Sequence, residues 1–515
     1  MRKAVKEQIL QLLQTLQEAH NEIAVCLQKG DVAQAKGTLA DCQDCAVLIG
    51  NTVEQSEPDA VEIVLKLENY CELLFRMHTG LTTEEHDGTE KLQKELNSQL
   101  QQITKAVENE IKAPLKMVFM PYKASMWTSL ATIWEAAQKD LDCEATVVVL
   151  PYYNLDIEQK PTELVYEAEL FPADIPIVPY MQYDLAKEHP DIIYIHNPYD
   201  GGNNVTRLPE QYYSYNLKKY TDKLVFSPYG LMGYYNPDIG AMMCCTSAVS
   251  IADKIIVQSE KVKQIYMDYG VEENRLLALG SPKVDAVVKS LDEPIVYPEG
   301  WKERLEGRKV FLLNTHLSYF IKGYLYKKKF PERMDYTAWY HRTFLDMLLN
   351  REGCALIWRP HPLMKATLKS RNLNETLALV EECEQRIYES DNAVIDKNGS
   401  YDMAFRISDA LISTYSSMIP EYMLSGKPVY IYENRLNEEN RKNSPVDYTN
   451  NYYKARVGEE PQFSIYIDMI LRGEDPLYEK RMEDIKRAFV NREGTIGQNI
   501  YNYLKTELLD EYRQM

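Results

Sequence analysis

The sequence predicts an α/β protein in which two open domains, each with a parallel sheet, follow an N-terminal bundle of helices. Three observations lead to this fold class. The chain has 515 residues, more than a single hydrophobic core usually serves, so two or three domains are expected. Its first stretch has the apolar spacing of helices throughout. From residue 115 onward, short apolar runs alternate with amphipathic helices, which is typical of βαβ units.

The first segment, residues 1–112, should form about four helices. Leu96, Leu100 and Ile103 recur at intervals of three and four, which places them on one helix face. Gly30 followed by Asp31 indicates that one helix ends there and another begins, because glycine suits the left-handed position after a helix and aspartate caps N-termini. We expect the bundle to act in packing or oligomerisation rather than in catalysis.

The remaining chain divides into two α/β domains and a helical end. The first set of strand-like runs is KMVFMPY, ATVVVLPYY, DIIYIHNPYD, DKLVFSPYG and DKIIVQSE, and the second is KVFLLNTH, CALIWRPHP, AVIDKNG, DALISTYSS and KPVYIYE. The proline-bearing segment DEPIVYPEGWKE separates the two sets. We therefore predict domains at 113–295 and 296–475 that face each other across a cleft. Residues 476–515 should be helices that pack back on the domains.

Composition excludes some classes of protein. A net charge of −19 argues against a nucleic-acid binder, because affinity for phosphate backbones depends on lysine and arginine. The N-terminus lacks the pattern of a signal peptide, and no apolar run approaches the roughly 20 residues of a membrane span. We expect a cytoplasmic protein, with peripheral contact at the inner face of the membrane left open. Cys42 and Cys45 form a C-x-x-C without a second pair, so a zinc site is not expected. We see no cluster of metal ligands and expect neither a metal nor another cofactor.

Several polar groups fall at the ends of predicted strands, where open parallel sheets bind their ligands. His196, His316 and His361 each follow an apolar strand run. Arg359 and His361 lie in IWRPHPLM, where two prolines place both residues in an extended, pre-set backbone.

A second group lies in SDALISTYSSMIPEYMLSGKPVYIYE. A buried strand runs into Ser413, Thr414, Tyr415, Ser416 and Ser417, and a helix begins near Met418. Hydroxyls and free backbone N–H groups at a helix N-terminus form a phosphate site, although a simple serine N-cap has the same pattern. Glu421 follows one turn later. It could complement the helix dipole or accept hydrogen bonds from a ribose.

These motifs resemble those of the CDP-glycerol glycerophosphotransferases of teichoic-acid and capsule synthesis, bacterial transferases of the GT-B fold. The resemblance covers about residues 220–435 and is strongest in RPHP and in LISTYSS through GKPV. DKIIVQSEKVKQIYMDYGVEENRLLALGSPKVDAV is also similar and ends near the family's G-x-P-R-x-D pattern. The resemblance implies a GT-B-like pair of Rossmann-type domains and a role in cell wall biogenesis.

The resemblance also assigns roles to individual residues. His361 and Arg359 would act on the nucleotide diphosphate, and the turn at Ser413, Thr414, Tyr415, Ser416 and Ser417 would contact its phosphates. From their positions in the sequence, we expect His316 and Glu421 to lie on the same donor side. Three departures stand out. Tyr229, in Pro-Tyr-Gly, takes the place of the family's proposed catalytic histidine, Thr414 replaces an aspartate, and Lys283 replaces an arginine.

We therefore expect a transferase that moves a glycerophosphate or related group from a CDP-linked donor to a polyol-phosphate, glycan or lipid-linked acceptor. The base would come from the first domain, with His196 as first candidate and Tyr229 as second. Asn197, Tyr199 and Asp200 beside His196, together with Lys322, would face the acceptor.

Three alternatives remain. The first is a GT-B glycosyltransferase that uses a nucleotide sugar for capsule polysaccharide. The second is an isomerase of the nucleotide-sugar 2-epimerase kind. The third is a non-catalytic scaffold of the same pathway that binds through its helical domain.

Overall fold

The computed structural model describes residues 1–81, 89–156, 158–203, 205–317, 319–321, 328–329, 336–361, 363–414, 416–432, 443–447, 453–454 and 460–514. The chain forms two compact units, which we describe separately. The first contains residues 1–117, 137–145 and 501–515, and the second contains 118–136 and 146–500. The four segments predicted from the sequence are a different division, and they stay a prediction.

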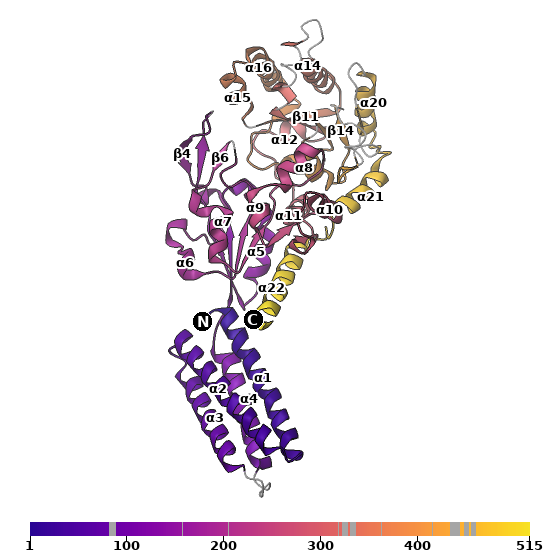
Figure 1. The fold of residues 1–515 in the computed structure, drawn as a ribbon. Coiled ribbons are helices and arrows are strands. Elements are labelled where there is room, and N and C mark those ends of the chain that lie inside the picture. The colour runs from indigo at the N-terminus through magenta and orange to yellow at the C-terminus, as the bar shows by residue number, and fades with distance from the viewer. Residues whose placement is uncertain are drawn as a thin grey trace. The chain divides into compact units, whose positions relative to one another are not determined.

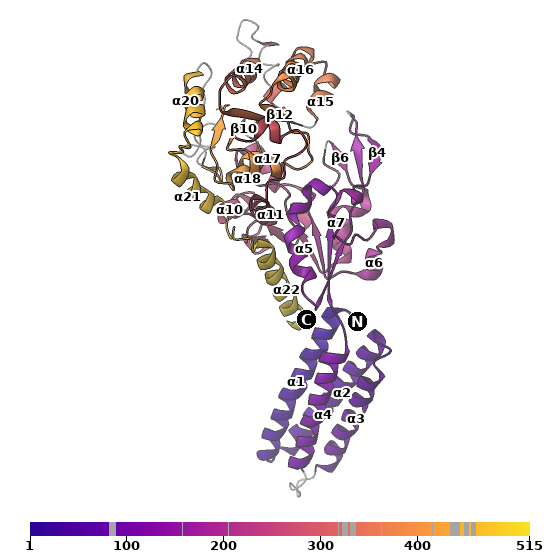
Figure 2. The same cartoon turned by 180° about the vertical axis from the view of Figure 1, so that it is seen from behind.

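The first unit contains four long helices that lie side by side (Figures 1 and 2). They are α1 (Lys3–Gln28), α2 (Val32–Ser56), α3 (Val61–Gly80) and α4 (Thr89–Glu110). Gly30 has a φ of +76°, and the Asp31 carboxylate accepts the N–H of Gln34 at 3.0 Å, so the predicted break between helices is confirmed. The apolar stripes meet in one core that includes Leu96, Leu100 and Ile103.

The chain's last helix contributes to both units. It is α22 (Ile496–Gln514). In the first unit, the Tyr501 hydroxyl donates to Asp140 at 2.7 Å, and the Arg513 guanidinium donates to Glu7 at 2.9 Å. In the second unit, the backbone N–H of Gly497 donates to Asp285 at 2.9 Å. Segments from opposite ends of the chain are therefore joined by specific polar contacts.

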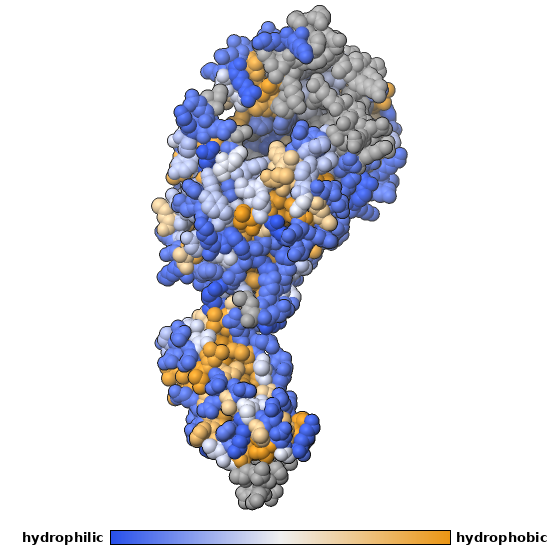
Figure 3. Space-filling view, in the orientation of Figure 1, coloured by the Kyte–Doolittle hydropathy of each residue, from blue (hydrophilic) through white to orange (hydrophobic). Residues whose placement is uncertain are grey.

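Hydrophobic side chains gather on the bundle surface over α2 and α3 (Figure 3). The exposed ones include Val47, Leu48, Val61, Leu65 and Phe75. The predicted oligomerisation through the bundle stays a prediction. Within the described residues, no helix is both long and apolar enough to cross a bilayer.

The second unit is built on two six-stranded sheets. The first has the order β2-β1-β5-β7-β8-β9, with β1 (Leu115–Met120), β2 (Cys143–Val147), β5 (Ile192–Ile195), β7 (Lys223–Phe226), β8 (Lys254–Ile256) and β9 (Leu276–Leu277). The second has the order β12-β11-β10-β13-β14-β15, with β10 (Lys309–Thr315), β11 (Cys354–Pro360), β12 (Ala393–Ile395), β13 (Ala410–Ser413), β14 (Val429–Ile431) and β15 (Tyr453–Lys454). All ten predicted strand runs form strands.

Helices connect the strands of this unit. They are α5 (Ala131–Gln138), α6 (Leu185–Glu188), α7 (Ser214–Leu217), α8 (Pro237–Cys244), α9 (Ser247–Ile251), α10 (Glu260–Asp268), α11 (Pro282–Leu291), α12 (Lys302–Leu305), α14 (Tyr336–Leu349), α15 (Met364–Ser370), α16 (Asn374–Glu389), α17 (Asp402–Ile407), α18 (Met418–Met423), α20 (Glu460–Leu471) and α21 (Tyr478–Ala488). Short 3-10 helices span Ala124–Ser129, Ala168–Leu170, Tyr180–Gln182, Glu210–Tyr212, Lys218–Tyr220 and Glu273–Arg275. A small antiparallel sheet of β4 (Pro161–Val165), β3 (Tyr152–Leu155) and β6 (Thr206–Arg207) was not predicted.

The second sheet places the candidate site. Its strands are parallel, and its order reverses at β10, which has β11 on one side and β13 on the other. Asn314 of β10 is in register with Arg359 on one side and with Ser413 on the other. The carboxyl ends of all three strands therefore meet at one topological switch point, where ligands of such sheets bind.

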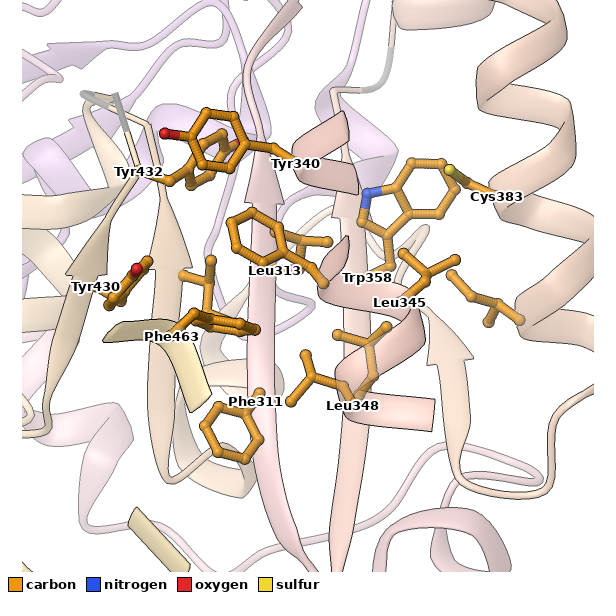
Figure 4. Packing of buried hydrophobic residues seen from close by; sticks show 14 of the residues in the cluster. Phe311, Leu313, Tyr340, Leu345, Leu348, Trp358, Cys383, Tyr430, Tyr432 and Phe463 are labelled. Atoms are coloured by element: carbon orange, nitrogen blue, oxygen red, sulfur yellow. The ribbon is translucent and has the colours of Figure 1, made fainter. Parts of the chain in front are cut away.

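A large aromatic core fixes this sheet (Figure 4). Trp358 of β11 is fully buried, and its indole N–H donates to the Thr315 hydroxyl at 3.1 Å. Phe463 of α20 packs with its ring centroid 5.1 Å from that of Tyr430 in β14. Because the side chains of the central strands are buried, a ligand would meet these strands at their ends rather than on their faces.

Candidate active site

His316 and His361 follow neighbouring strands, β10 and β11, and lie side by side. Their ring centroids are 5.8 Å apart, and the rings are inclined by 75°. The Nδ1 atom of His361 accepts the backbone N–H of Leu363 at 3.2 Å, so the neutral ring carries its proton on Nε2. Burial lowers the pKa of His361. This residue is thus a preset hydrogen-bond donor that is neutral at pH 7.

The serine-rich turn lies beside this pair at the end of β13. The Asn314 side-chain amide donates to the hydroxyls of Ser413 and Ser416, each at 2.9 Å. Ser413 is buried and also donates to the backbone oxygen of Thr414 at 2.7 Å, so its hydroxyl is used within the protein. Ser416 is half-buried and Ser417 is exposed, directly before α18. Tyr415 lies outside the described residues.

Two buried oxygens in this region have no hydrogen-bond partner in the part of the chain that the structure describes. They are Oγ1 of Thr414 and Oε2 of Glu421. Thr414 replaces the aspartate of the motif that this turn resembles. The whole residue is only 2 % exposed. The turn is therefore not fully satisfied by the protein's own contacts.

Arg359 lies at the end of β11 and contacts the loop that follows β12. Its guanidinium forms an ion pair with the buried Asp396 and donates to the backbone oxygens of Asn398 at 3.0 Å and Ser400 at 3.3 Å. It also lies 5.6 Å from the centre of the Tyr401 ring. Its charge is paired with Asp396 and its donors hold the loop between β12 and α17, which favours a structural role, and its assignment as a phosphate ligand stays a prediction.

The contacts of His196 favour a structural role, and its assignment as a catalytic base stays a prediction. The residue is fully buried. Its Nε2 atom accepts the N–H of Tyr122 at 3.1 Å, and its Nδ1 atom donates to the backbone oxygen of Met126 at 3.2 Å and lies 3.1 Å from Ser129 Oγ. Burial lowers the pKa of His196 to about 3. With both nitrogens engaged, the ring joins the end of β5 to neighbouring loops.

The residues after His196 separate into structural and cavity-lining groups. The Asp200 carboxylate accepts the backbone N–H of Ser214 at 3.0 Å and its hydroxyl at 2.6 Å, so it holds the first residue of α7. The Asn197 side chain accepts the N–H of Tyr199 at 3.3 Å and is buried. Of the described members of the predicted acceptor-side group, Asn197, Tyr199 and Asp200, only Tyr199 lines the cavity described next. Lys322 lies outside the described residues.

A cavity of about 470 Å³ lies between the ends of the two sheets in this unit. From the first sheet and its helices it is lined by Tyr199, Tyr229, Tyr234, Met242, Met243 and Tyr266, among others, and from the second sheet by His316, Ser416 and Ser417. Burial raises the pKa of Tyr229, and the nearby Tyr199 and Tyr122 add to the effect. Tyr229 therefore lies at the site but stays protonated at neutral pH.

An ion pair closes one side of this region. Lys283, at the start of α11, donates to Glu421 of α18 at 2.7 Å and to the backbone oxygen of Tyr229 at 3.3 Å. Both charged side chains are largely buried, at 14 % and 4 % exposure. Burial raises the pKa of Glu421, and Lys283 opposes that rise. Sequence reasoning noted Lys283 as a departure from a motif but did not foresee this pair.

The arrangement can bind an anion and move a proton. It has two imidazoles, two hydroxyls at the start of a helix and an adjacent cavity large enough for a small molecule. Among the described residues, no group of three histidine, cysteine or carboxylate side chains could hold a metal ion.

Comparison with known proteins identifies relatives of this chain. A family model described as CDP-Glycerol:Poly(glycerophosphate) glycerophosphotransferase matches residues 242–506, just over half of the chain. No curated protein matches. A UDP-N-acetylglucosamine 2-epimerase from Listeria monocytogenes is similar in structure, with a TM-score of 0.53 and 13% identity over 77% of this chain and 98% of that one. The wall teichoic acid polymerase TagF matches with a TM-score of 0.46 and 14% identity, over 88% of this chain and 98% of the polymerase chain. The epimerase similarity shows a common two-domain GT-B fold.

Proposed function

This chain belongs to the CDP-glycerol:poly(glycerophosphate) glycerophosphotransferase family, and we propose that it transfers a glycerophosphate group from a CDP-linked donor to an acceptor hydroxyl. The single observation that supports this best is the meeting of His316, His361, Ser416 and Ser417 beside one cavity at the switch point of the second sheet. We further propose that the acceptor is part of teichoic-acid or capsule polymer synthesis, reached at the inner face of the membrane.

The reaction is a displacement at phosphorus. The acceptor oxygen forms a bond to the phosphorus that carries the glyceryl group, and the bond from that phosphorus to the bridging oxygen breaks. CMP leaves with the electron pair, and the acceptor hydroxyl loses its proton. Charge on the leaving phosphate must be met by fixed donors, which act best when they need no reorganisation.

The donor phosphates would be held by His361 together with Ser416 and Ser417. The Nε2–H of His361 is fixed by the hydrogen bond that its Nδ1 atom accepts from Leu363. Ser416 is held by Asn314, and Ser417 is exposed at the beginning of α18. Glu421 is placed one turn further along this helix, where its unpaired Oε2 would accept from a ribose hydroxyl.

We propose that the acceptor hydroxyl belongs to a polyol-phosphate, a glycan or a lipid-linked chain. Among the described residues that line the cavity there is no lysine, arginine, aspartate or glutamate. The donor phosphates and an acceptor phosphate would both meet this lining, so it does not separate the acceptor classes.

CDP binding by calorimetry and CMP release by a coupled assay test the donor side. Ser416→Ala combined with Ser417→Ala should weaken CDP binding about tenfold or more, since each lost hydrogen bond to a charged group is worth about 1.5–3 kcal/mol. Ser425→Ala, just past the end of α18, is the matched control. Unchanged affinity in the double variant would refute the phosphate site. We also propose that no resident cofactor is needed, so CMP release should persist in EDTA.

The glycosyltransferase alternative is separated by a donor panel. CDP-glycerol should be consumed in the presence of acceptor and UDP- or GDP-sugars should not. Turnover of a nucleotide sugar alone would replace the proposed function with the alternative, and binding without any turnover would favour the scaffold.

A further inference from the structure

We propose that His316 is the general base that removes the proton from the acceptor hydroxyl, an inference that rests on the proposed glycerophosphate transfer. The residue directly follows β10, the central strand of the second sheet, whose Thr315 is paired in register with Pro360 of β11. Its backbone is therefore fixed at the switch point. Its side chain lines the cavity beside Ser416 and Ser417.

The other titratable side chains at the cavity do not suit this role. Within the described lining there is no carboxylate, lysine or cysteine, and the remaining candidates are Tyr199, Tyr229, Tyr234 and Tyr266. A phenol is protonated at pH 7, and burial raises the pKa of Tyr229 and of Tyr266 further. A histidine ordinarily titrates near pH ~6.5, which suits a base at neutral pH.

The neighbouring imidazole, His361, suits a different task. His361 has its Nδ1 atom committed to the Leu363 N–H, so it presents only a donor to the site. A donor serves the leaving phosphate, whereas a base needs a nitrogen that accepts. The 5.8 Å between ring centroids lets one histidine face the phosphates while the other faces the attacking hydroxyl.

Among the described residues, His316 lies beside His361 at the end of β11 and lines the cavity together with the tyrosines of the first sheet and the two serines before α18. An ion pair of the same site joins Lys283 and Glu421 at 2.7 Å. In the proposed step the acceptor O–H bond breaks, its proton goes to His316, the new O–P bond forms and CMP departs.

His316→Asn tests the assignment with the whole chain. We expect kcat for CMP release in the presence of acceptor to fall at least ~10²-fold, the usual contribution of a general base. CDP affinity should stay within about threefold, because the base does not hold the donor. The acid limb of the wild-type kcat profile, near the ordinary histidine range, should be absent in the variant. His361→Asn should instead weaken CDP binding.

His189→Asn is the matched control. His189 has a φ of +39°, a left-handed conformation that asparagine tolerates, and it lies at the end of α6. Circular dichroism melting confirms that each variant is folded. A kcat for His316→Asn within tenfold of wild type, or an unchanged acid limb, would overturn the proposal. If the wild-type chain neither binds CDP nor releases CMP, the proposed function itself fails, which is a different result.

Discussion

Lys283→Met should destabilise the second unit by about 3–5 kcal/mol, because it leaves Glu421 buried without its counter-charge. The pair is 2.7 Å long, so with an effective dielectric constant of ~20 the Coulomb attraction is roughly 6 kcal/mol. In the wild type, the desolvation penalty of the two ions offsets several kcal/mol of that attraction. Removal of the lysine alone forfeits the attraction and keeps the desolvation cost of Glu421.

The loss should depend on pH in a defined direction. Burial already raises the pKa of Glu421, and without Lys283 nothing opposes that rise. A carboxyl whose pKa is raised in the folded state stabilises the fold below its unfolded pKa, near ~4.3, and loses that contribution as pH rises through the folded value. Lys283→Met should therefore be most destabilised at neutral pH and nearest to wild type in acid.

Urea denaturation followed by circular dichroism measures this effect at pH 7 and at pH 4.5. The double variant Lys283→Met with Glu421→Gln removes both charges and should recover most of the lost stability. Lys160→Met, which breaks an exposed pair with Glu158, is the control and should cost less than ~1 kcal/mol. A Lys283→Met variant as stable as that control, or one that weakens as pH falls, would refute the reasoning.

Two further predictions concern Arg359, whose contacts favour a structural role, and Gly497, which the sequence analysis did not single out. Arg359→Lys should reduce the free energy of unfolding, measured by urea denaturation, by about 1–3 kcal/mol. The reason is that lysine lacks the forked guanidinium that reaches two loop oxygens as well as Asp396. CDP affinity should stay unchanged, and a tenfold loss of affinity would instead support Arg359 as a phosphate ligand. Gly497→Ala should reduce the free energy of unfolding by about 3 kcal/mol and so lower the melting temperature, because the added Cβ would collide with the backbone of Thr132. Gly399→Ala is the control. Gly399 has open space around it, so this variant should melt like wild type.

The strands and their order of appearance could be read from the sequence because they are local features. All ten predicted runs are short and apolar, and each is bounded by polar or proline residues, so propensity and burial agree. The small sheet of β3, β4 and β6 could not be read in this way. In β6, Thr206 pairs with Asn154 and Arg207 pairs with Tyr153, about fifty residues earlier in the chain. A local sequence pattern does not indicate a pairing over that separation.

The sequence by itself determined which groups stand at strand ends: His196, His316, His361 and the serine turn all lie where it predicted. Only the tertiary structure decided which of them meet the cavity. The ring of His196 is buried and hydrogen-bonded to the backbone of Tyr122 and Met126, and the guanidinium of Arg359 forms an ion pair with Asp396. The physical reason is that a side chain's partners come from segments distant in sequence, and burial and hydrogen bonding by those partners decide whether a polar group supports the fold or is available to a substrate.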